Sequence, residues 1–392
     1  MEPHSIYLHI PFCRHRCGYC DFNTFAGLED RIPDYIEALI QEIRQAAAGS
    51  SVRIPVHTVF FGGGTPSLIP ADLMGRVTAG LGEAFDLLPG YEMTLEANPG
   101  TVSAQYLREL CGMGFNRISY GMQSARPDEL RLLERQHSMF DVIEAVQWAR
   151  EAGFDNLSLD LIYGLPFQGL ADWQQTVEMA VALHPEHLSL YALTIEEGTP
   201  LHRMRRKGLI AEPDDDIAAD MYEWATDRLE TAGFAPYEIS NWAQLDGQGT
   251  LLACRHNLQY WLARPYFGFG AGAHGYVGEV RAANVRGVNE YIRRIWHNTA
   301  HFPLGAAVNE TWPIDPRTAM QEMMMVGLRL VESGVERADF LRRFGTHPED
   351  VFGKELHDLT GKGLLEDNGE RIRLTRRGRL LGNLVFMQFV GD

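Results

Sequence analysis

The stretch that decides the fold of this sequence is Tyr7-Leu-His-Ile-Pro-Phe-Cys-Arg-His-Arg-Cys-Gly-Tyr-Cys-Asp-Phe22. It holds Cys13, Cys17 and Cys20 within eight residues, in a chain of 392 residues that has only five cysteines. Thiolates at this density usually bind a metal ion or an iron–sulfur cluster. A four-iron cluster held by three thiolates keeps one iron open, and an open iron can bind a substrate. The stretch therefore predicts a cluster that takes part in chemistry.

Two simpler interpretations of the three cysteines stay open. Their spacing also lines one face of a helix, which would make them buried structural thiols, but Pro11 and Gly18 disfavour a regular helix here. A zinc site completed by His15 is chemically feasible, but its spacing is unusual and no second pair of thiols follows. Cys111, in a helix-like stretch that ends at Gly112, is expected to be an ordinary buried thiol.

The composition limits the class of protein. The chain has 35 basic and 52 acidic residues and a net charge of −17, which disfavours general binding to nucleic acid because that needs a basic surface. No apolar run approaches the roughly 20 residues that span a bilayer, and the first residues carry no secretory signal. Few cysteines and a reduced cluster favour the cytoplasm. Peripheral membrane association and a homodimer are left open.

Strand and helix patterns alternate through the first two-thirds of the chain. Strands are predicted at Ser5–Ile10, Val56–Phe61, Tyr91–Ala97, Phe115–Tyr120, Leu157–Tyr163 and His187–Leu193. Helices are predicted at Pro33–Ala48, Ala71–Phe85, Val102–Met113, Met139–Ala152 and Trp173–Leu183. Repeated units of this length predict a parallel sheet with right-handed crossovers, where ligands bind beyond the C-terminal ends of the strands. Periodicity alone fits a barrel and a doubly wound open sheet equally well.

The pattern of alternating strands and helices changes after about residue 300. Residues 301–316 have the composition of a linker. Further helices are predicted at Arg317–Val331, Asp339–Phe344 and Pro348–Thr360. A hairpin with its turn at Asn368-Gly369 follows, and Thr375 is expected to cap a last helix that runs to about Phe389.

These patterns predict two domains. The first spans residues 1–300 and includes the segment 254–276, and the second is a smaller, helical, winged-helix-like domain over residues 310–392. The basic residues of Lys362–Arg379 permit a DNA-binding interpretation of the second domain, but their excess over acidic residues is modest.

Five motifs occur in an order known from one protein family. They are Tyr7 to Phe22, Gly62-Gly-Gly-Thr-Pro66, Glu96-Ala-Asn-Pro99, Gly121-Met-Gln123 and Asp160-Leu-Ile-Tyr-Gly-Leu-Pro166. In these motifs the sequence resembles the radical SAM (S-adenosylmethionine) superfamily, and in particular the branch that contains oxygen-independent coproporphyrinogen III oxidases and heme chaperones. The resemblance covers most of the chain. It implies an α/β fold, a partial (β/α)6 barrel of the TIM type, followed by the C-terminal helical domain.

The resemblance also implies two cofactors. Cys13, Cys17 and Cys20 would bind three irons of a [4Fe–4S] cluster, and SAM would chelate the fourth. The residues that match SAM-contacting positions of the family are Tyr7, Tyr19, Gly63, Gly64, Thr65, Glu96, Gln123, Arg135, Asp160, Ala273 and His274. Glycines let backbone approach a ligand, and an arginine fork matches the SAM carboxylate. No residue is assigned a catalytic role.

The last two of these residues lie in Gly270-Ala-Gly-Ala-His-Gly275, which matches G-x-G-x-x-G. A strand-like run rather than a helix follows this match, so it does not indicate a nicotinamide site. In the family that the sequence resembles, the segment closes the cofactor pocket.

Two departures separate this sequence from the oxidases of that branch. The oxidases carry a fourth cysteine two residues after the third, where this chain has Phe22, and an N-terminal extension, whereas the first strand is expected here at Ser5. The run His256-Asn-Leu-Gln-Tyr260-Trp261 instead resembles the heme-binding signature of the chaperone group. Neutral imidazole is a common axial ligand of heme iron, and the two aromatic side chains offer flat apolar contacts.

The sequence therefore predicts a cytoplasmic radical SAM protein that binds heme and passes it to client heme proteins, with SAM and the cluster gating the transfer. Three alternatives stay open: oxidative decarboxylation of coproporphyrinogen III to protoporphyrinogen IX, radical-driven modification of heme, and a zinc-stabilised regulator that binds DNA. An electron donor such as a flavodoxin or ferredoxin is implied, because the cluster must be reduced before SAM is cleaved. Whether the protein is an enzyme that consumes SAM is left undecided.

Overall fold

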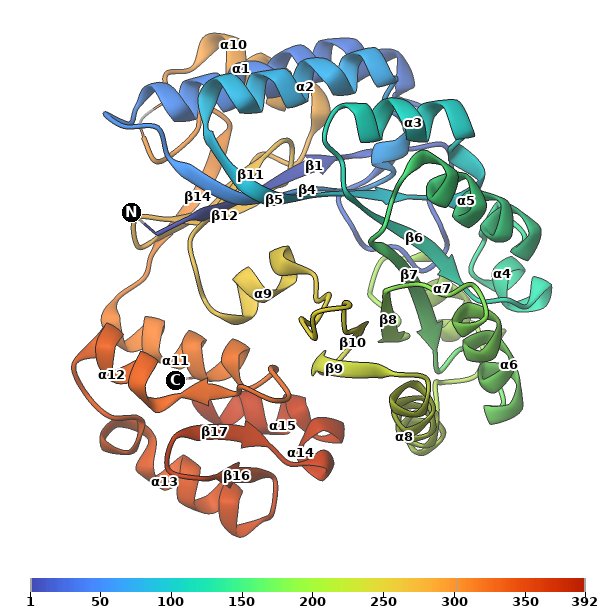
Figure 1. Cartoon of the computed structure of the whole chain (residues 1–392), viewed down its shortest axis with the longest axis vertical. Coiled ribbons are helices and arrows are strands. Elements are labelled where there is room, and N and C mark those ends of the chain that lie inside the picture. Colours follow the sequence, from blue (N-terminus) through green and yellow to red (C-terminus); the bar gives the residue numbers. More distant parts are fainter. Residues whose placement is uncertain (1, 301, 391–392) are drawn as a thin grey trace. The chain divides into compact units, whose positions relative to one another are not determined.

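The computed structural model describes residues 2–300 and 302–390, which form two compact units (Figure 1). The first unit comprises Met1–Arg228 and Pro265–Trp312, and the second comprises Leu229–Arg264 and Pro313–Asp392. Each unit is thus assembled from two separate stretches of the chain. No helix among the described residues combines the length and the apolar character needed to cross a bilayer.

A parallel sheet forms the centre of the first unit. Its strands follow the order of the chain: β1 (His4–Ile10), β4 (Pro55–Gly63), β5 (Asp86–Ala97), β6 (Arg117–Gln123), β7 (Leu157–Tyr163) and β8 (His187–Ala192). Apolar side chains on these strands, such as Leu8, Phe61 and Leu159, are completely buried. Continuous burial of this kind is typical of a parallel sheet that other elements cover.

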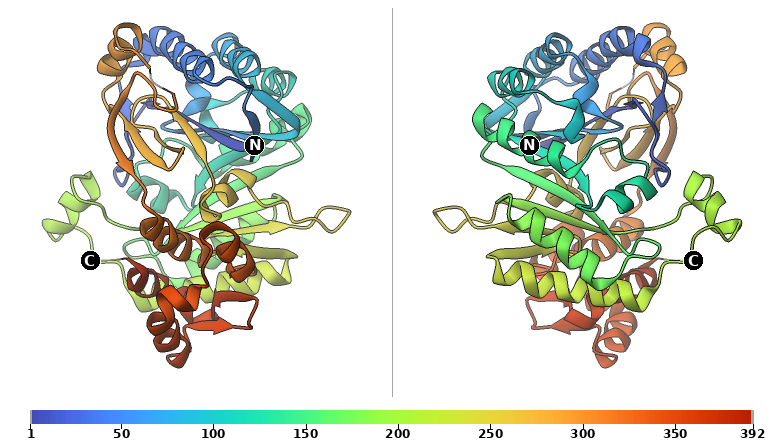
Figure 2. Two further views of the ribbon diagram at one scale, coloured as in Figure 1. Left: turned by 90° about the vertical axis from the view of Figure 1, so that its left-hand side faces the viewer. Right: turned by 90° about the vertical axis from the view of Figure 1, so that its right-hand side faces the viewer.

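Helices connect these strands and lie along the outer face of the sheet (Figures 1 and 2). They are α1 (Ile32–Ala48), α2 (Ala71–Ala84), α3 (Ala104–Gly112), α4 (Pro127–Leu132), α5 (Met139–Ala152) and α6 (Leu170–Val181). α7 (Pro200–Arg206) and α8 (Asp215–Thr231) follow β8. This alternation confirms the predicted partial (β/α)6 barrel.

Local sequence explains where these helices begin and end. The apolar stripe of α1, for example Tyr35, Leu39 and Ile43, is completely buried. α5 begins at a capping box in which the hydroxyl of Ser138 and the carboxylate of Asp141 bond reciprocally to backbone amides. It ends at Gly153, whose positive φ of 100° suits glycine alone among common residues.

The sheet continues on the far side of β1. β11 (Tyr266–Phe269) pairs with β1 in parallel, and β12 (His274–Val277), β13 (Val280–Asn284) and β14 (Val308–Pro313) follow at the edge. α10 (Val288–His297) packs on α1. The stretch that the sequence indicated as a linker therefore contains a strand, β14.

The second unit contains the predicted winged-helix-like arrangement. Its helices α11 (Pro316–Gly327), α12 (Arg337–Phe344) and α13 (Pro348–Gly361) accompany a small sheet ordered β15 (Val335–Glu336), β17 (Arg371–Leu374) and β16 (Leu365–Asp367). β16 and β17 form the predicted antiparallel hairpin. Their apolar side chains share one core, in which Leu328, Phe340 and Ile372 are completely buried.

The predicted last helix is wrong in its length. Thr375 does cap a helix, because its hydroxyl accepts a bond of 2.9 Å from the amide of Gly378. That helix, α14 (Arg376–Leu380), ends after five residues, and α15 (Gly382–Phe386) and a turn of 3-10 helix (Met387–Phe389) follow. Leu381 at the break has φ −108° and ψ 23°, and the glycine after it gives the backbone little preference for helix.

The segment 229–264 belongs to the second unit. It forms the antiparallel pair β9 (Phe234–Glu238) and β10 (Asn241–Gln244), and then α9 (Arg255–Trp261). The guanidinium of Arg343 donates bonds of 3.0 and 3.3 Å to the carbonyls of Leu262 and Ala263, which ties the end of this segment to α12. The segment 254–276, which the sequence indicated as part of the first domain, is therefore divided between the units after Arg264.

Candidate functional site

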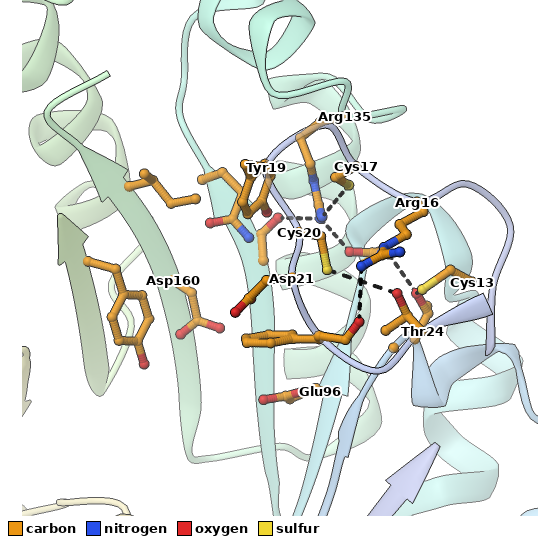
Figure 3. A pocket seen from close by; sticks show the side chains of 18 of the residues that line it. Cys13, Arg16, Cys17, Tyr19, Cys20, Asp21, Thr24, Glu96, Arg135 and Asp160 are labelled. Atoms are coloured by element: carbon orange, nitrogen blue, oxygen red, sulfur yellow. Dashed lines mark hydrogen bonds between the residues drawn. The ribbon is translucent and has the colours of Figure 1, made fainter. Parts of the chain in front are cut away.

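A cavity of about 350 Å³ lies at the C-terminal ends of the parallel strands in the first unit (Figure 3). Its volume is within the range of small-molecule sites. The predicted cofactor residues that line it are Cys13, Cys17, Tyr19, Cys20, Gly63, Gly64, Thr65, Glu96, Gln123, Arg135 and Asp160. The alternating strands and helices therefore bring together side chains from positions 13 to 160 of the sequence.

The cysteine loop is closed by a short parallel pair, β2 (Phe12–Cys13) and β3 (Phe25–Ala26). Cys13, at the end of β2, is 8% exposed, whereas Cys17 and Cys20 are half-buried. Burial raises the pKa of the Cys13 and Cys20 thiols. Their thiolates therefore need a nearby positive charge, such as a bound metal, to form readily at neutral pH.

Each of the three sulfurs has its own polar neighbour. The hydroxyl of Thr65 donates to Sγ of Cys13 at 3.6 Å, and the guanidinium of Arg135 lies 3.6 Å from Sγ of Cys17. Sγ of Cys20 lies 4.0 Å from the hydroxyl of Thr24. The loop thus holds the three sulfurs at separate points around the cavity (Figure 3).

The arrangement bears on the zinc alternative. Within residues 2–300 and 302–390, no three His, Cys, Asp or Glu side chains gather closely enough to hold one metal ion. His15, the fourth ligand in that alternative, instead bonds to Oε2 of Glu134 at 3.0 Å. A structural zinc needs all its thiolates at about 2.3 Å from one ion, whereas each thiolate of a four-iron cluster binds a different iron. Three thiols on one loop, with His15 engaged elsewhere, fit the cluster better.

The glycine run passes directly against the cysteine loop. The amide of Gly64 donates to the carbonyl of Ile10 at 2.7 Å, and a Cβ at Gly64 would lie 2.6 Å from the carbonyl oxygen of Phe12 and 3.1 Å from Sγ of Cys13. Gly63 has φ +109°, a conformation that side chains disfavour. The absence of side chains is therefore required at both positions.

Two carboxylates from neighbouring parts of the sheet face the cavity. Glu96 is the next-to-last residue of β5, and Asp160 lies on β7, where it accepts bonds of 3.1 Å from the hydroxyl of Ser119. Burial, and then the charge of Asp160, raises the pKa of Glu96 to about 7, and burial also raises the pKa of Asp160. A cationic ligand would stabilise both carboxylates in their charged form.

The guanidinium of Arg135 joins three parts of the cavity wall. Besides Cys17, it donates to the carbonyl of Gly121 at 2.9 Å and to the side-chain oxygen of Asn98. Asn98 in turn donates to the hydroxyl of Thr65 at 3.0 Å. The planar guanidinium of an arginine can donate to several acceptors that lie in one plane. A ligand carboxylate is another acceptor that it can bind.

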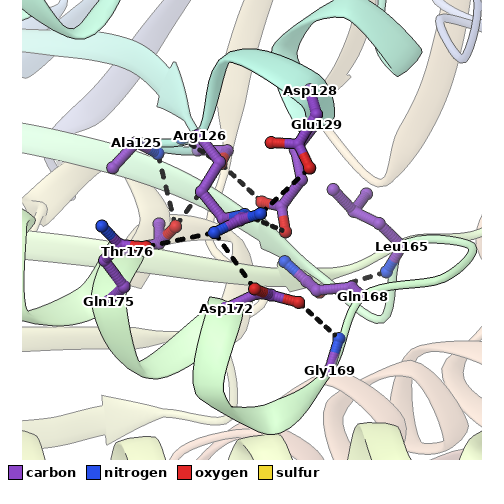
Figure 4. A network of polar contacts seen from close by, with 11 residues as sticks. Ala125, Arg126, Asp128, Glu129, Leu165, Gln168, Gly169, Asp172, Gln175 and Thr176 are labelled. Atoms are coloured by element: carbon purple, nitrogen blue, oxygen red, sulfur yellow. Dashed lines mark hydrogen bonds and ion pairs between the residues drawn. The ribbon is translucent and has the colours of Figure 1, made fainter.

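A polar network supports the end of β6 outside the cavity (Figure 4). The guanidinium of Arg126 bonds to Asp128 at 3.0 Å, to Asp172 at 3.1 Å and to Gln175 at 3.2 Å. The carboxylate of Asp172 also accepts from the amide of Gly169 at the start of α6. The network therefore fixes the segment that follows Gln123 against α6.

Three of the residues predicted to contact SAM do not line this cavity. The hydroxyl of Tyr7 lies 2.9 Å from Nδ1 of His9. Ala273 is 2% exposed, and His274 is exposed, with its ring parallel to that of Trp312 at 6.3 Å between centroids. Tyr7 lies on the interior strand β1, and His274 begins β12 directly after Ala273.

The cavity also has wall residues that sequence reasoning did not select. Examples are Asn98, Ser119, Tyr191 and Glu196. Asn98 lies just beyond β5 and Tyr191 is the next-to-last residue of β8, so their place at the C-terminal end of a strand was a signal that could have identified them. Ser119 gave no such signal, because it lies inside β6 and only pairing of the strands sets it beside Asp160.

The predicted heme residues lie in the second unit, on α9. His256 is 1% exposed, and its Nε2 is 2.9 Å from the hydroxyl of Tyr260, one helical turn later. The indole of Trp261 lies under the guanidinium of Arg329 at 4.4 Å, and that guanidinium also pairs with Glu238 at 3.0 Å. The structure therefore brings His256 and Tyr260 together, with Nε2 of His256 engaged in a hydrogen bond.

Comparison with known proteins identifies the family of this chain. Residues 7–180 match the radical SAM superfamily, and residues 314–381 match the HemN C-terminal domain. The heme chaperone HemW of Bacillus subtilis (strain 168) is 37% identical, over 99% of this chain and 99% of that protein. The chain belongs to the HemW family of radical SAM proteins. The heme chaperone HemW of Mycobacterium tuberculosis (strain H37Rv) is 39% identical, over 100% of this chain and 95% of its own length.

A solved structure shows the same fold as this HemW-family chain. The radical SAM enzyme coproporphyrinogen III oxidase (HemN) from Escherichia coli superposes with a TM-score of 0.82, at 23% identity, over 99% of this chain and 90% of that one. The predicted fold and family are thus confirmed.

Membership of the radical SAM superfamily implies a [4Fe–4S] cluster and SAM, and the cavity fits both. It offers three thiols on one loop, a wall of glycine backbone with no room for side chains beside Cys13, and two half-buried carboxylates near a guanidinium. These groups match the donors that a cluster and a cationic amino acid derivative need.

Proposed function

We propose that this chain is a heme chaperone that holds a [4Fe–4S] cluster and SAM in the cavity of its first unit, binds heme through the His256 segment, and delivers heme to client heme proteins. One observation carries the proposal: the three-cysteine cavity occurs in a chain that is similar over its full length to proteins named heme chaperone HemW.

In this proposal Cys13, Cys17 and Cys20 are the cluster ligands. Glu96 and Asp160 accept hydrogen bonds from SAM, and Arg135 orients its carboxylate; their burial and distances support these roles. When bound, the cluster and SAM supply a one-electron cleavage of a carbon–sulfur bond. The chain contributes binding and orientation.

For heme, His256 is the proposed axial ligand, with Tyr260 and Trp261 as contacts to the macrocycle. The short helix α9 places His256 and Tyr260 on one face, as expected for residues four apart. Ligation at Nε2 requires that the bond to Tyr260 opens first. Heme binding at Nε2 therefore requires a change in the side-chain conformation of His256 or Tyr260.

The test is anaerobic reconstitution followed by parallel assays of iron and sulfide, hemin titration, 5′-deoxyadenosine, and the mass of added heme. We expect Cys17→Ser to lose the broad cluster absorbance and to keep much of the heme binding. His256→Ala should weaken heme binding and keep its iron and sulfide. Cys111→Ser, which changes a thiol far from the loop, is the control.

The assays also separate the alternatives. Heme recovered unchanged and passed to an apo heme protein supports a chaperone, whereas protoporphyrinogen formed from added coproporphyrinogen III would establish an oxidase. Equal loss of cluster and heme in both variants would show that one site explains both. Because reduced thiols persist in the cytosol, we also propose a cytoplasmic location.

A further inference from the structure

Five positively charged side chains surround the cysteine loop. Arg14 and Arg16 are exposed on the loop itself, and Arg203, Arg206 and Lys207 are exposed on α7 or directly after it. None of the five has an ion-pair partner in the part of the chain that the structure describes. We call these five residues the basic rim. It is a local excess of positive charge in a chain whose net charge is −17.

The two halves of the basic rim adjoin. The amide of Leu201, in the first turn of α7, donates to the carbonyl of Gly18 between Cys17 and Cys20, at 2.9 Å. Leu201 belongs to the apolar cluster against which Tyr19 and Met204 also pack, so α7 is held on the loop by apolar contacts as well. A single hydrogen bond would not fix the orientation of α7 on the loop.

This contact limits the width of the basic rim. Arg16 is two residues from Gly18, and Arg203 is two residues from Leu201, so their Cα atoms lie within about 20 Å of each other. A standard interface buries about 800 Å² on each partner and is about 30 Å wide. One partner of ordinary size therefore covers the loop and α7 together.

Several acidic residues near the rim are already engaged or belong to the cavity, whereas Glu197, just before α7, is exposed. Glu134 pairs with His15 at 3.0 Å, and Glu212 pairs with Arg205 at 3.3 Å. Asp21 and Glu196 line the cavity. The five cations of the rim are thus free to meet a partner without losing an ion pair within the chain, and that loss would otherwise offset the gain on docking.

We propose that the basic rim is the docking surface of an acidic electron-transfer protein that carries a reduced flavin. The inference rests on the proposed function, because only a cluster bound by the loop needs an electron there. One electron leaves the flavin hydroquinone, which becomes the semiquinone, and enters the cluster, which passes from the 2+ to the 1+ state. A nucleic acid is a poorer occupant, because the chain's overall negative charge repels a long polyanion.

The position of the rim suits this role. The loop that carries Cys17 and Cys20 is itself part of the rim, so a partner seated on it approaches the sulfurs directly. Complementary charge speeds the encounter of two proteins and makes it sensitive to salt. Transient electron-transfer complexes also have small interfaces, which the rim is large enough to supply.

The test compares two matched double variants of the full chain. Arg203→Glu/Arg206→Glu reverses two charges of the rim, and Lys362→Glu/Arg377→Glu reverses two exposed charges of the second unit. Both change the net charge equally. The probe is a purified flavodoxin, an acidic protein with bound flavin mononucleotide, and its Kd is measured by biolayer interferometry at low and high ionic strength.

We expect the rim variant to bind flavodoxin about tenfold more weakly at low salt, since about 1.4 kcal/mol corresponds to a factor of ten. The control should stay within about twofold of the unchanged protein, and high salt should reduce the difference between them. Equal affinity of the rim variant and the unchanged protein overturns the proposal. So does an equal loss in both double variants, because it would reflect net charge alone.

A second readout separates this proposal from the proposed function. Stopped-flow absorbance follows reduction of the reconstituted cluster by reduced flavodoxin and by dithionite. The rim variant should be reduced slowly by flavodoxin and normally by dithionite, which needs no docking surface. If dithionite does not bleach the absorbance of the unchanged protein, the cluster assignment fails, whereas unimpaired reduction of the rim variant by flavodoxin refutes only the docking surface.

Discussion

The backbone amide of Gly63 donates a hydrogen bond of 3.1 Å to Oε2 of Glu96. This bond joins the end of β4 to the end of β5 at the wall of the cavity. It depends on the positive φ of Gly63, where a Cβ would lie 2.6 Å from the imidazole ring of His9. The backbone conformation of Gly63 thus helps to orient the half-buried carboxylate of Glu96.

Gly63→Ala should therefore damage both the fold and the cavity. The strained backbone is expected to cost roughly 1–3 kcal/mol in the free energy of unfolding. SAM affinity, measured by calorimetry on reconstituted protein, should fall as Glu96 moves. Gly82→Ala is the control, because Gly82 lies exposed in α2 with no atom within 4 Å of its added Cβ, and it should stabilise the protein by up to about 1 kcal/mol. A Gly63→Ala protein with unchanged unfolding and SAM binding would contradict this account.

Thr65→Val tests the hydrogen bond to Cys13. The hydroxyl of Thr65 donates to Sγ of Cys13 at 3.6 Å, and hydrogen bonds to cluster sulfurs stabilise the reduced, more negative cluster. Valine keeps the shape and removes the donor, so we expect the midpoint potential of the reconstituted cluster to become more negative. A redox titration followed by electron paramagnetic resonance measures it. Thr78→Val, which removes a hydroxyl on α2, should leave the potential unchanged.

Tyr260→Phe tests whether the bond between Tyr260 and His256 restrains heme ligation. The bond of 2.9 Å occupies Nε2, and a typical hydrogen bond contributes about 1 kcal/mol. Removing the hydroxyl while keeping the ring should therefore increase hemin affinity by about fivefold. A hemin titration followed at the Soret band measures the change. Weaker binding would show instead that the hydroxyl contributes directly to the heme site.

Glu42 provides a prediction for the effect of pH. This carboxylate on α1 is 1% exposed and accepts bonds from the amide of Gly270 at 2.8 Å, the side chain of Asn284 at 2.8 Å and the hydroxyl of Tyr291 at 2.7 Å. Burial raises its pKa to about 7, despite the three bonds that oppose the shift. The folded state therefore favours the protonated form of Glu42.

The direction of the effect follows from proton linkage. Between about pH 4.5 and pH 7 the unfolded chain has lost this proton while the folded chain keeps it, so stability falls as pH rises, by roughly 3 kcal/mol in total. Urea unfolding at about pH 5 and pH 8 measures the fall. It should be smaller in Glu42→Gln, which cannot ionise, and unchanged in Glu83→Gln, where the carboxylate is exposed. An equal fall in all three proteins would exclude Glu42 as the source.

Much of the barrel could be predicted because its signals are local. The stripe of Tyr35, Leu39 and Ile43 and the capping residues around α5 act within a few turns of one helix. The ends of the strands could be predicted in the same way. They also indicated the end of the sheet at which Glu96 and Gln123 would lie near the cysteine loop. The cysteine spacing itself needs no tertiary information.

The rest depends on contacts between distant residues. The strands beyond β11 pair at the edge of the sheet, and β14 has little apolar character of its own, with five of its six residues exposed. The bond of Arg135 to Gly121 and Asn98 needs the pairing of β5 and β6, which no local pattern specifies. Tyr7, Ala273 and His274 were selected through resemblance alone, and the structure places them off the cavity wall.

The second unit is assembled from an internal insertion and the tail of the chain. The amide of Val331 donates to the carbonyl of Tyr237 at 3.1 Å, and Leu330 and Glu238 form a bridge between the two stretches. A premature stop near Trp312 would therefore do more than delete a tail. It would leave residues 229 to 264 without the tail on which they pack, removing the donor to the Tyr237 carbonyl and the Arg329 ion pair of Glu238. Part of the scaffold of the His256 helix would thus be lost while the cysteine codons were left intact.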